Sequence, residues 1–273
     1  MLEAESVLKA FGIKEPRPDI EIFLSFILHI KRSRLPLFRS DKLPPDKVSQ
    51  FQNFIERRAN REPAAYIIGS CSFMGLDFKV DSNVLIPRPE TEILTEAVLN
   101  FAKQNNKKTV LDLCCGSGAI AVSLSKLGSF DYICASDISE GAIKIAKENA
   151  LLNKAVGIDF LKSDLFETLA GKTFDIIVSN PPYISESEFK NLEAELRYEP
   201  KISLLASCRG LSFYKQIAQK AKNFLNKNGT LFLELNANLP LEIKRIFEKK
   251  GYTNIEISAD YAGLDRVLKA DAG

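Results

Sequence analysis

From residue 108 onward, short apolar runs of strand length alternate with segments whose apolar residues recur at helical spacing. Strands separated by helices do not pair as hairpins, so the alternation predicts an α/β fold with a mostly parallel, doubly wound sheet. In such a sheet, ligands bind beyond the carboxyl ends of the strands, near the point where the strand order reverses. The expected strands are residues 109–113, 132–136, 158–161, 175–179, 230–235 and 254–258, and the expected helices are residues 119–127, 140–152, 211–226 and 239–249.

The residues before this region have a different rhythm and predict a second, smaller domain. Helical spacing favours helices at about 2–11, 19–31 and 44–60, with proline-containing stretches between them. We therefore expect a small helical bundle over residues 1–70. Short alternating segments around Gly75 indicate a β-hairpin linker over residues 71–86, followed by the catalytic domain over residues 87–273.

The charge distribution gives no reason to expect stable nucleic-acid binding. The net charge is +2, and of 37 Lys/Arg and 35 Asp/Glu, 13 and 10 lie in residues 1–80, which leaves 24 and 25 after them. A protein that follows a phosphate backbone concentrates its cations on one face or segment. Neither residues 1–80 nor residues 81–273 carry such a concentration of positive charge.

Cysteine and histidine usage argues against disulfides, metal sites and histidine catalysis. The chain has five cysteines, an odd number, and two of them are adjacent, which is typical of a protein in a reducing cytoplasm. Its single histidine, His29, lies in an apolar stretch without the partners that a base or ligand needs. No apolar run of about 18 residues and no basic leader is present, so we expect a soluble, unexported, cytoplasmic protein.

Two stretches at expected strand ends favour a nucleoside ligand. Residues 110–120 run from a strand through Cys114, Cys115, Gly116, Ser117 and Gly118 into a helix, which lets backbone approach a ligand closely. Asp137 ends the next strand, where a carboxylate can bind both hydroxyls of a ribose, although it could instead cap the following helix. Because the turn lacks the full dinucleotide pattern, a single nucleoside with an amino-acid tail is preferred over NAD.

A third acid follows the next expected strand. Asp164 could accept the exocyclic amine of adenine, with Leu165 and Phe166 covering the ring. The alternative for Asp164 is a helix cap.

The stretch Asn180-Pro181-Pro182-Tyr183 after residues 175–179 has the residue types that methylation of a planar nitrogen requires. Such a nitrogen is a poor nucleophile because its lone pair is delocalised. The side-chain oxygen of Asn180 and the carbonyl of Pro181 could accept its two N–H groups and aim the developing lone pair at a methyl donor. The prolines keep the backbone rigid, and Tyr183 offers a ring on which the target group can stack.

In order and spacing, these motifs resemble a class I S-adenosylmethionine-dependent methyltransferase with a Rossmann-like, seven-stranded sheet. Outside that shared fold, residues 63–69, 73–78, 85–92 (Leu-Ile-Pro-Arg-Pro-Glu-Thr-Glu) and 198–200 (Tyr-Glu-Pro) resemble the PrmC/HemK family. The resemblance implies methylation of N5 of the glutamine in the Gly-Gly-Gln motif of class 1 peptide chain release factors. It also implies that the N-terminal bundle docks the factor and that no metal takes part.

The resemblance also implies a set of site residues. The catalytic residues would be Asn180, Pro181 and Tyr183, with Pro182 added for binding the substrate. Contacts to S-adenosylmethionine, and to the product S-adenosylhomocysteine, carry over to Cys114, Cys115, Gly116, Ser117, Gly118, Asp137, Leu165 and Asn180, to which the residue chemistry adds Asp164.

Two positions depart from the family pattern. Cys114 stands where the turn usually begins with glycine, and a positive φ there would strain it. Cys114 and Cys115 could form a redox switch or simply pack in the core. Residues 234–238 differ from the family's usual glycine and glutamine, which leaves their contribution open.

Two rival functions use the same residues. A DNA adenine or RNA guanine methyltransferase would need the same amide clamp, but it would also carry a basic recognition segment. A binding module without activity would not need the acceptor at Asn180. We expect a monomeric enzyme whose partners are release factors and which binds neither membrane nor nucleic acid stably.

Overall fold

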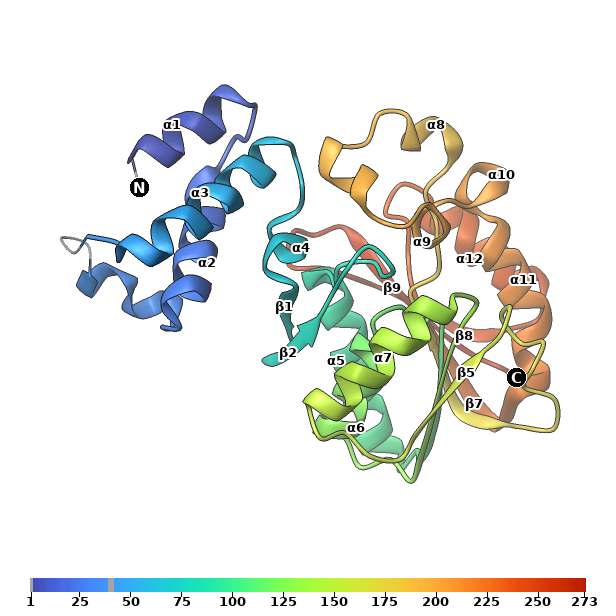
Figure 1. The fold of residues 1–273 in the computed structure, drawn as a ribbon. Coiled ribbons are helices and arrows are strands. Elements are labelled where there is room, and N and C mark those ends of the chain that lie inside the picture. The colour runs from blue at the N-terminus through green and yellow to red at the C-terminus, as the bar shows by residue number, and fades with distance from the viewer. Residues whose placement is uncertain (1, 39–41) are drawn as a thin grey trace. The chain divides into compact units, whose positions relative to one another are not determined.

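The structure is a computed structural model that describes residues 2–38 and 42–273 (Figure 1). The chain divides into two compact units, Met1–Ser70 with Glu193–Tyr198, and Cys71–Leu192 with Glu199–Gly273. No helix within the described ranges is long and apolar enough to cross a membrane. Of the expected bundle, residues 1 and 39–41 lie outside the described part.

The first unit is a bundle of short helices around an apolar core. Phe23 packs edge to face on Phe54, with ring centroids 5.4 Å apart, among buried Leu8, Ile20 and Ile27. The helices are α1 (Leu2–Ala10), α2 (Pro16–Leu28), η1 (Arg32–Phe38), α3 (Pro45–Ala59) and α4 (Ala64–Ile68).

The expected start of the second helix was wrong by three residues. Pro16 and Pro18 lie in the first turn of α2 and do not separate it from the preceding segment, because backbone N–H groups there have no partner inside the helix. The helix ends at Leu28, and His29 adopts the left-handed conformation just after it.

A segment from far along the chain belongs to the first unit. The short helix η2 (Ala194–Tyr198) is held there by Glu195, whose carboxylate oxygens accept hydrogen bonds from Arg58 at 2.9 Å and Arg61 at 2.6 Å. The hydroxyl of Tyr198 donates to the carbonyl oxygen of Asn60 at 2.7 Å. No local sequence pattern predicts this placement, since the bonds span more than 130 residues.

The second unit begins with the hairpin of β1 (Ser70–Phe73) and β2 (Leu76–Lys79). Its two central residues, Met74 and Gly75, both have positive φ, as a tight hairpin turn requires. The side chain of Asn149 joins the hairpin to the glycine turn, because it bonds to the backbone of Lys79 and to the carbonyl oxygen of Ser117.

A seven-stranded sheet forms the centre of the second unit, with the strand order β5-β4-β3-β6-β7-β9-β8. All pairs are parallel except those of β9, so the mostly parallel, seven-stranded class I methyltransferase fold is confirmed. The strands are β3 (Thr109–Leu113), β4 (Tyr132–Asp137), β5 (Ile158–Lys162), β6 (Phe174–Ser179), β7 (Leu225–Glu234), β8 (Thr253–Ala259) and β9 (Asp265–Asp271).

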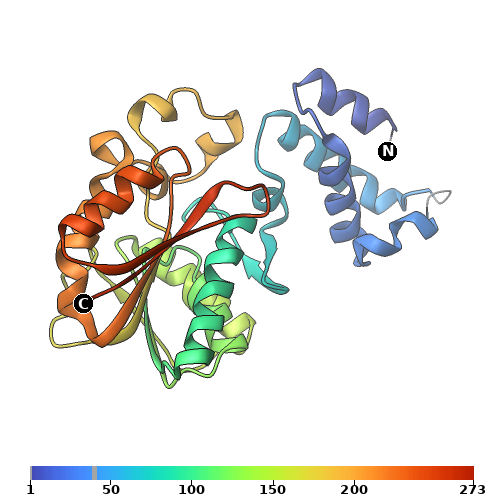
Figure 2. The same cartoon turned by 180° about the vertical axis from the view of Figure 1, so that it is seen from behind.

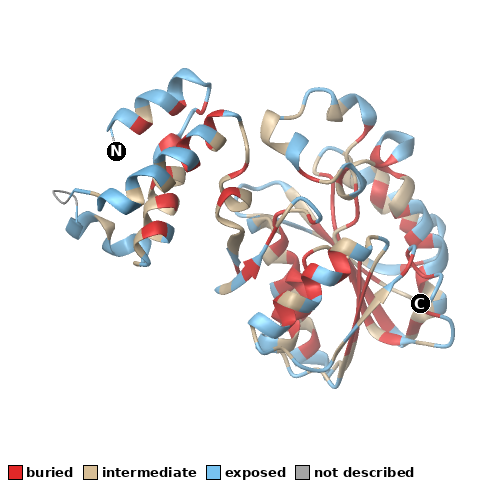
Figure 3. Cartoon of the chain, in the orientation of Figure 1, coloured by how far each residue is buried: buried red, intermediate tan, exposed pale blue. Residues whose placement is uncertain are grey.

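Helices cover both faces of this sheet, as the two opposite views show (Figures 1 and 2). Successive strand residues alternate between two cores: Val110 and Ile176 pack with α5, α6 and α7, whereas Leu111 and Ile177 pack with α11 and α12. The central strands are accordingly buried (Figure 3). The helices are α5 (Pro89–Asn105), α6 (Ala119–Leu127), α7 (Glu140–Leu152), α11 (Ser212–Lys220) and α12 (Pro240–Lys249), with short turns α8 (Glu186–Phe189), α9 (Lys201–Leu204) and α10 (Ser207–Gly210).

Several elements differ from the periodicity-based predictions. Helix α5 and strand β9 were not predicted, and β7 begins at Leu225 and not at residue 230. The helix expected over residues 211–226 is shorter, since α11 passes into the 3₁₀ turn η3 (Ala221–Phe224) before β7. Strand β9 mixes charged and apolar residues without strict alternation and is held by antiparallel pairing on both sides. That pairing is a tertiary effect, so a window of local sequence does not reveal it.

Candidate active site

The carboxyl ends of four neighbouring strands bring the expected site residues to one edge of the sheet. Leu113, the last residue of β3, lies opposite Ser136 in β4 and Ser179 in β6, so the turn at Cys114 is flanked by Asp137 and Asn180. After β3 the chain continues outward to β4 and β5, then crosses back to β6. The strand order therefore reverses between β3 and β6. Ligands of such sheets bind at the carboxyl ends of the strands next to this point.

The two glycines of the turn after β3 have different physical roles. Gly116 has φ +53°, and a Cβ built on it would meet no atom within 4 Å, so open space lies over this backbone. Gly118 has φ +78°, and its Cβ would come within 3.0 Å of the Cβ of Ala146. Gly116 thus leaves room for a ligand, whereas Gly118 lets α6 approach α7. A direct cofactor contact remains a prediction for both.

Cys114 has a positive φ of +59°, so its backbone is in the left-handed region that strains a residue with a side chain. The thiols of Cys114 and Cys115 have pKa values raised by burial, and the negative charge of Asp137 adds to the effect. A raised pKa disfavours the thiolate, which is the reactive form. Packing is therefore the better account of this pair than a redox switch.

Asp137 is half-buried and holds the glycine turn in place. Its Oδ2 accepts the N–H of Gly116 at 2.9 Å and its Oδ1 accepts the N–H of Ser139 at 2.9 Å. The cap of α7 is Ser139, whose hydroxyl oxygen accepts the N–H of Ala142 at 3.2 Å. The helix-cap alternative for Asp137 was thus wrong. Burial raises the pKa of its carboxylate, and the contact of this carboxylate with ribose hydroxyls remains a prediction.

Asp112, the acid inside β3, is fully buried and only half satisfied. Its Oδ2 accepts the N–H of Ala121 at 3.1 Å, while Oδ1 has no hydrogen-bond partner in the described part of the chain. Burial raises the pKa of Asp112 to about 8. The hydrogen bond from Ala121 lowers this pKa, and the negative charge of Asp137 raises it further. An unpaired carboxyl oxygen beside the glycine turn fits a ligand that carries a cationic amino-acid tail.

This raised pKa predicts a pH-dependent stability that Asp112→Asn removes. Between the ordinary pKa of 3.8 and about 8, the folded cofactor-free protein holds a proton that the unfolded chain releases. The free energy of unfolding should therefore fall as pH rises through this window, by up to about 1.4 kcal/mol per pH unit. Urea unfolding from pH 5 to 8 should show this slope in the wild type and in Asp131→Asn, an exposed control, and a shallower slope in Asp112→Asn. Equal slopes in all three proteins would contradict the prediction.

The turn after β5 supports only part of the expected adenine site. Asp164 is exposed, and Ser163 makes the side-chain bonds of the turn, to the carbonyl oxygen of Leu165 and from the N–H of Thr168. The expectation that Phe166 covers a ligand ring was wrong, since its own ring stacks on Phe224 in the core at 4.7 Å. Contacts of Asp164 and Leu165 with the cofactor remain predictions.

The Asn-Pro-Pro-Tyr stretch is anchored by residues from two distant elements. Asn180 donates from Nδ2 to the hydroxyl oxygen of Thr91 at 3.1 Å, and Thr91 donates to Oε2 of Glu234 at 2.6 Å. Tyr183 donates from its hydroxyl to Oε1 of the same carboxylate at 3.1 Å. Pro181 and Pro182 between them are buried. One buried carboxylate thus holds both ends of the motif.

The backbone of Tyr183 is held as firmly as its side chain. Its carbonyl oxygen accepts a hydrogen bond from Nδ2 of Asn236 at 3.2 Å. The segment Cys208, Arg209 and Gly210 packs against it in three consecutive left-handed conformations. Residues 234–238, whose contribution the sequence left open, therefore supply Glu234 and Asn236 to the site.

Gly210→Ala should disturb this backbone. Its added Cβ would lie 2.3 Å from the carbonyl oxygen of Tyr183, so either the motif or the loop must move. We expect turnover to fall by about 10-fold or more and stability by about 1–3 kcal/mol. Gly171→Ala is the matched control, since Gly171 has φ +78° with no atom within 4 Å of the added Cβ. It should lose stability and keep its turnover; similar turnover in the two variants would contradict the contact.

Residues 85–92 make hydrogen bonds and an ion pair to several other segments of the second unit. Arg88 pairs with the buried carboxylate of Glu199, which also accepts the N–H of Ile86 at 3.3 Å. Glu92 accepts the N–H of Met74 in the hairpin turn at 2.5 Å. The sequence marked this stretch as family-specific but did not assign a role to Thr91 or Glu234.

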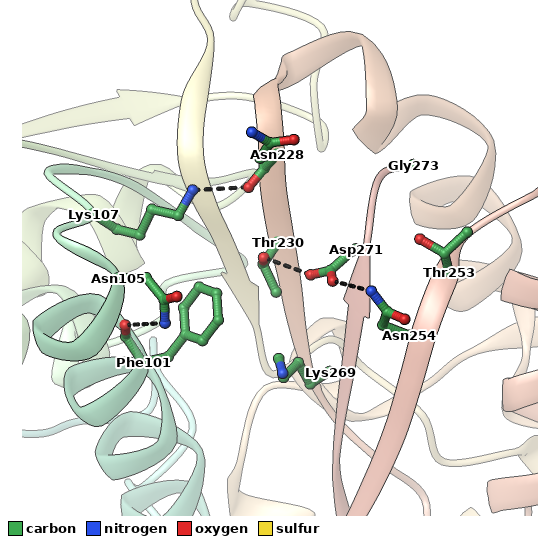
Figure 4. Close-up of a pocket in the computed structure, with 10 residues that line it drawn as sticks. All are labelled: Phe101, Asn105, Lys107, Asn228, Thr230, Thr253, Asn254, Lys269, Asp271 and Gly273. Carbon is green, nitrogen blue, oxygen red and sulfur yellow. Dashed lines mark hydrogen bonds between the residues drawn. The ribbon is translucent and has the colours of Figure 1, made fainter.

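A pocket elsewhere in the second unit does not compete with this site. It lies between the end of α5 and the opposite ends of β7, β8 and β9 (Figure 4). Its polar groups already bond to one another, as in the contacts of Asp271 with Thr230 and Asn254. The expected site residues lie at the other edge of the sheet, next to Leu113, Ser136 and Ser179.

Comparison with known proteins agrees with this geometry. The model of the methyltransferase small domain matches residues 88–197, and that of the PrmC N-terminal domain matches residues 1–69. Among solved structures, a methyltransferase from Pyrococcus furiosus is similar with a TM-score of 0.55 and 18% identity, over 74% of this chain and 91% of that one. The 16S rRNA N2 G1207 methyltransferase of T. thermophilus has a TM-score of 0.53 and 21% identity, over 74% and 49%. Fold and strand-end geometry together define a class I S-adenosylmethionine-dependent methyltransferase.

Curated relatives narrow the class to one family. The release factor glutamine methyltransferase of Clostridium acetobutylicum is 39% identical, over 100% of this chain and 97% of its own length. That of Aquifex aeolicus is 37% identical, over 94% and 91%. The chain belongs to the release factor glutamine methyltransferase family, so the PrmC/HemK resemblance is confirmed.

Proposed function

We propose that this protein transfers a methyl group from S-adenosylmethionine to N5 of the glutamine in the Gly-Gly-Gln motif of class 1 peptide chain release factors. The observation that carries the proposal is the orientation of Asn180. Its Nδ2 is engaged by Thr91, which leaves Oδ1 free to accept an N–H of the substrate amide. Family membership favours a glutamine side chain, and not a nucleic-acid base, as the group that is methylated.

The residues at the strand ends fit the cofactor. The open backbone at Gly116, the half-buried carboxylate of Asp137 and the unpaired Oδ1 of Asp112 suit a nucleoside with a cationic amino-acid tail. When bound there, S-adenosylmethionine supplies an electrophilic methyl group on a sulfonium. We assign its contacts to Cys114, Cys115, Gly116, Ser117, Gly118, Asp137, Asp164, Leu165 and Asn180.

Catalysis by the chain itself would consist of orientation and charge placement. Asn180 Oδ1 and the Pro181 carbonyl would accept the two amide hydrogens, while Tyr183 packs against the amide plane. Positive charge would develop on the nitrogen as the sulfur–methyl bond breaks, which leaves S-adenosylhomocysteine, and the new N–C bond forms; both acceptors would stabilise that charge. The nitrogen then loses one proton to solvent, because a methylated amide nitrogen that carries an extra proton is strongly acidic.

The first unit would dock the release factor. It exposes several large apolar side chains that would contribute to a docking surface: Leu2, Val7, Phe11, Phe26, Leu37, Phe38 and Val48. It also holds η2, which follows the Asn-Pro-Pro-Tyr motif along the chain. Residues 1–70 would thus recognise the factor while residues 87–273 carry out methyl transfer. Because release factors act on ribosomes, we expect the protein to work in the cytoplasm, as a monomer and without stable nucleic-acid binding.

Methyl transfer from labelled S-adenosylmethionine tests this function. The substrates are a purified release factor, the same factor with its Gly-Gly-Gln glutamine replaced, a short peptide with the motif, duplex DNA and ribosomal RNA. We expect label on the intact factor, much less on the peptide that lacks the docking surface, and none on the others. Label on nucleic acid would overturn the substrate and favour the DNA adenine or RNA guanine alternative.

A further inference from the structure

Thr91 and Glu234 form a relay of hydrogen bonds behind the Asn-Pro-Pro-Tyr motif. Thr91 lies in the first turn of α5 and Glu234 is the last residue of β7, and they are 5% and 1% exposed. Within the second unit the relay runs from Asn180 to Thr91 at 3.1 Å and from Thr91 to Glu234 at 2.6 Å. Neither residue faces solvent, so their bonds serve the interior of the site.

With Glu234 ionised, the chemistry of the relay fixes the direction of every bond in it. A carboxylate accepts hydrogen bonds and donates none, so Glu234 draws the hydroxyl hydrogens of Thr91 and Tyr183 toward itself. Burial raises the pKa of Glu234, and these two donors and the charge of Arg266 oppose that shift. Because the hydroxyl hydrogen of Thr91 is donated to Glu234, the hydroxyl oxygen can only accept a hydrogen bond from Asn180. Asn180 must therefore turn its NH₂ group toward Thr91 and its oxygen away.

We propose that Thr91 and Glu234 are positioning residues that select the amide orientation of Asn180 and so determine that an acceptor, not a donor, faces the substrate nitrogen. The inference rests on the proposed function, because the orientation matters only for a target with N–H groups to bind. A flipped Asn180 would present two donors to the N–H groups of the target amide. Glu234 would set Tyr183 at the same time, since its second oxygen holds the phenol.

Thr91→Val tests the relay with little change in shape. Valine fills the same space but cannot accept from Asn180, so either orientation of the amide becomes available. Thr91→Ser is the rescue variant, because it restores the hydroxyl. Thr95→Val is the matched control: Thr95 is also buried in α5, but its hydroxyl bonds to the carbonyl oxygen of Thr91 in its own helix at 3.0 Å.

We expect turnover by Thr91→Val to fall by about 10-fold, with KM values for cofactor and release factor changed less than about threefold. Thr91→Ser and Thr95→Val should stay near the wild-type turnover. A separate readout needs no substrate: hydrogen exchange of the Asn180 side-chain NH₂, observed by NMR on asparagine-labelled protein and assigned by its loss in Asn180→Asp. This exchange should be about 10-fold faster in Thr91→Val than in the other three proteins, as expected from the loss of one hydrogen bond.

The two readouts separate this inference from the proposed function. If the wild type does not methylate the release factor, the function is wrong, and the exchange rates still report on the relay. Unchanged exchange and turnover in Thr91→Val would overturn the relay. Equal losses in Thr91→Val and Thr95→Val would also overturn it, because they would indicate a general packing defect in α5.

Discussion

Asn180→Ala should lower the turnover of methyl transfer by at least about 100-fold, the largest effect that we expect of any single substitution on the chemical step. In the proposed mechanism, the side-chain oxygen of Asn180 is the acceptor for the substrate amide, because its Nδ2 donates to Thr91. Its loss removes stabilisation mainly from the transition state, where the nitrogen becomes more positive, because the other assigned cofactor contacts remain. Cofactor affinity should therefore change by no more than about threefold.

The measurement is kcat with saturating release factor, combined with calorimetric binding of S-adenosylmethionine. Asn191→Ala, at an exposed asparagine further along the chain, is the control and should behave as the wild type. An Asn180→Ala protein that binds cofactor and turns over at a near wild-type rate would refute the amide clamp.

Asp137→Ala should weaken S-adenosylmethionine binding by at least about 100-fold. Two contributions add: the loss of charged hydrogen bonds to the ribose, each worth about 1.5–3 kcal/mol, and the release of the turn that Asp137 holds through the N–H of Gly116. With saturating cofactor, turnover should largely recover, since Asn180 and Tyr183 remain in place. This is the opposite pattern to that of Asn180→Ala.

Ser139→Ala separates cofactor binding from helix capping. Ser139 caps α7 and lies two residues from Asp137, so its loss should reduce stability by about 1 kcal/mol with little change in cofactor affinity. Titration of the three proteins with S-adenosylmethionine gives the comparison. If Ser139→Ala weakened binding as much as Asp137→Ala does, Asp137 would act through the helix and not through the ribose.

Much of the site was predictable because its signals are local. The strand, glycine turn and helix around Gly116 are contiguous, and the acid at Asp137 follows at the end of the next strand. The chemistry that we propose for Asn180 and Tyr183 follows from the residue types and the prolines between them. Phe166 was predicted wrongly because a side chain next to a site residue can point into the core, where it stacks on Phe224.

The sequence by itself determined the parallel α/β fold of the second unit, because the spacing of apolar residues encodes which faces of each strand and helix are buried. It also determined the family, through stretches such as residues 85–92. The tertiary structure alone decided that Thr91, 89 residues before Asn180, would be its hydrogen-bond partner and that Glu234 would join Thr91 to Tyr183. The physical reason is that a buried polar atom needs a partner, and packing of the whole chain decides which distant side chain reaches it.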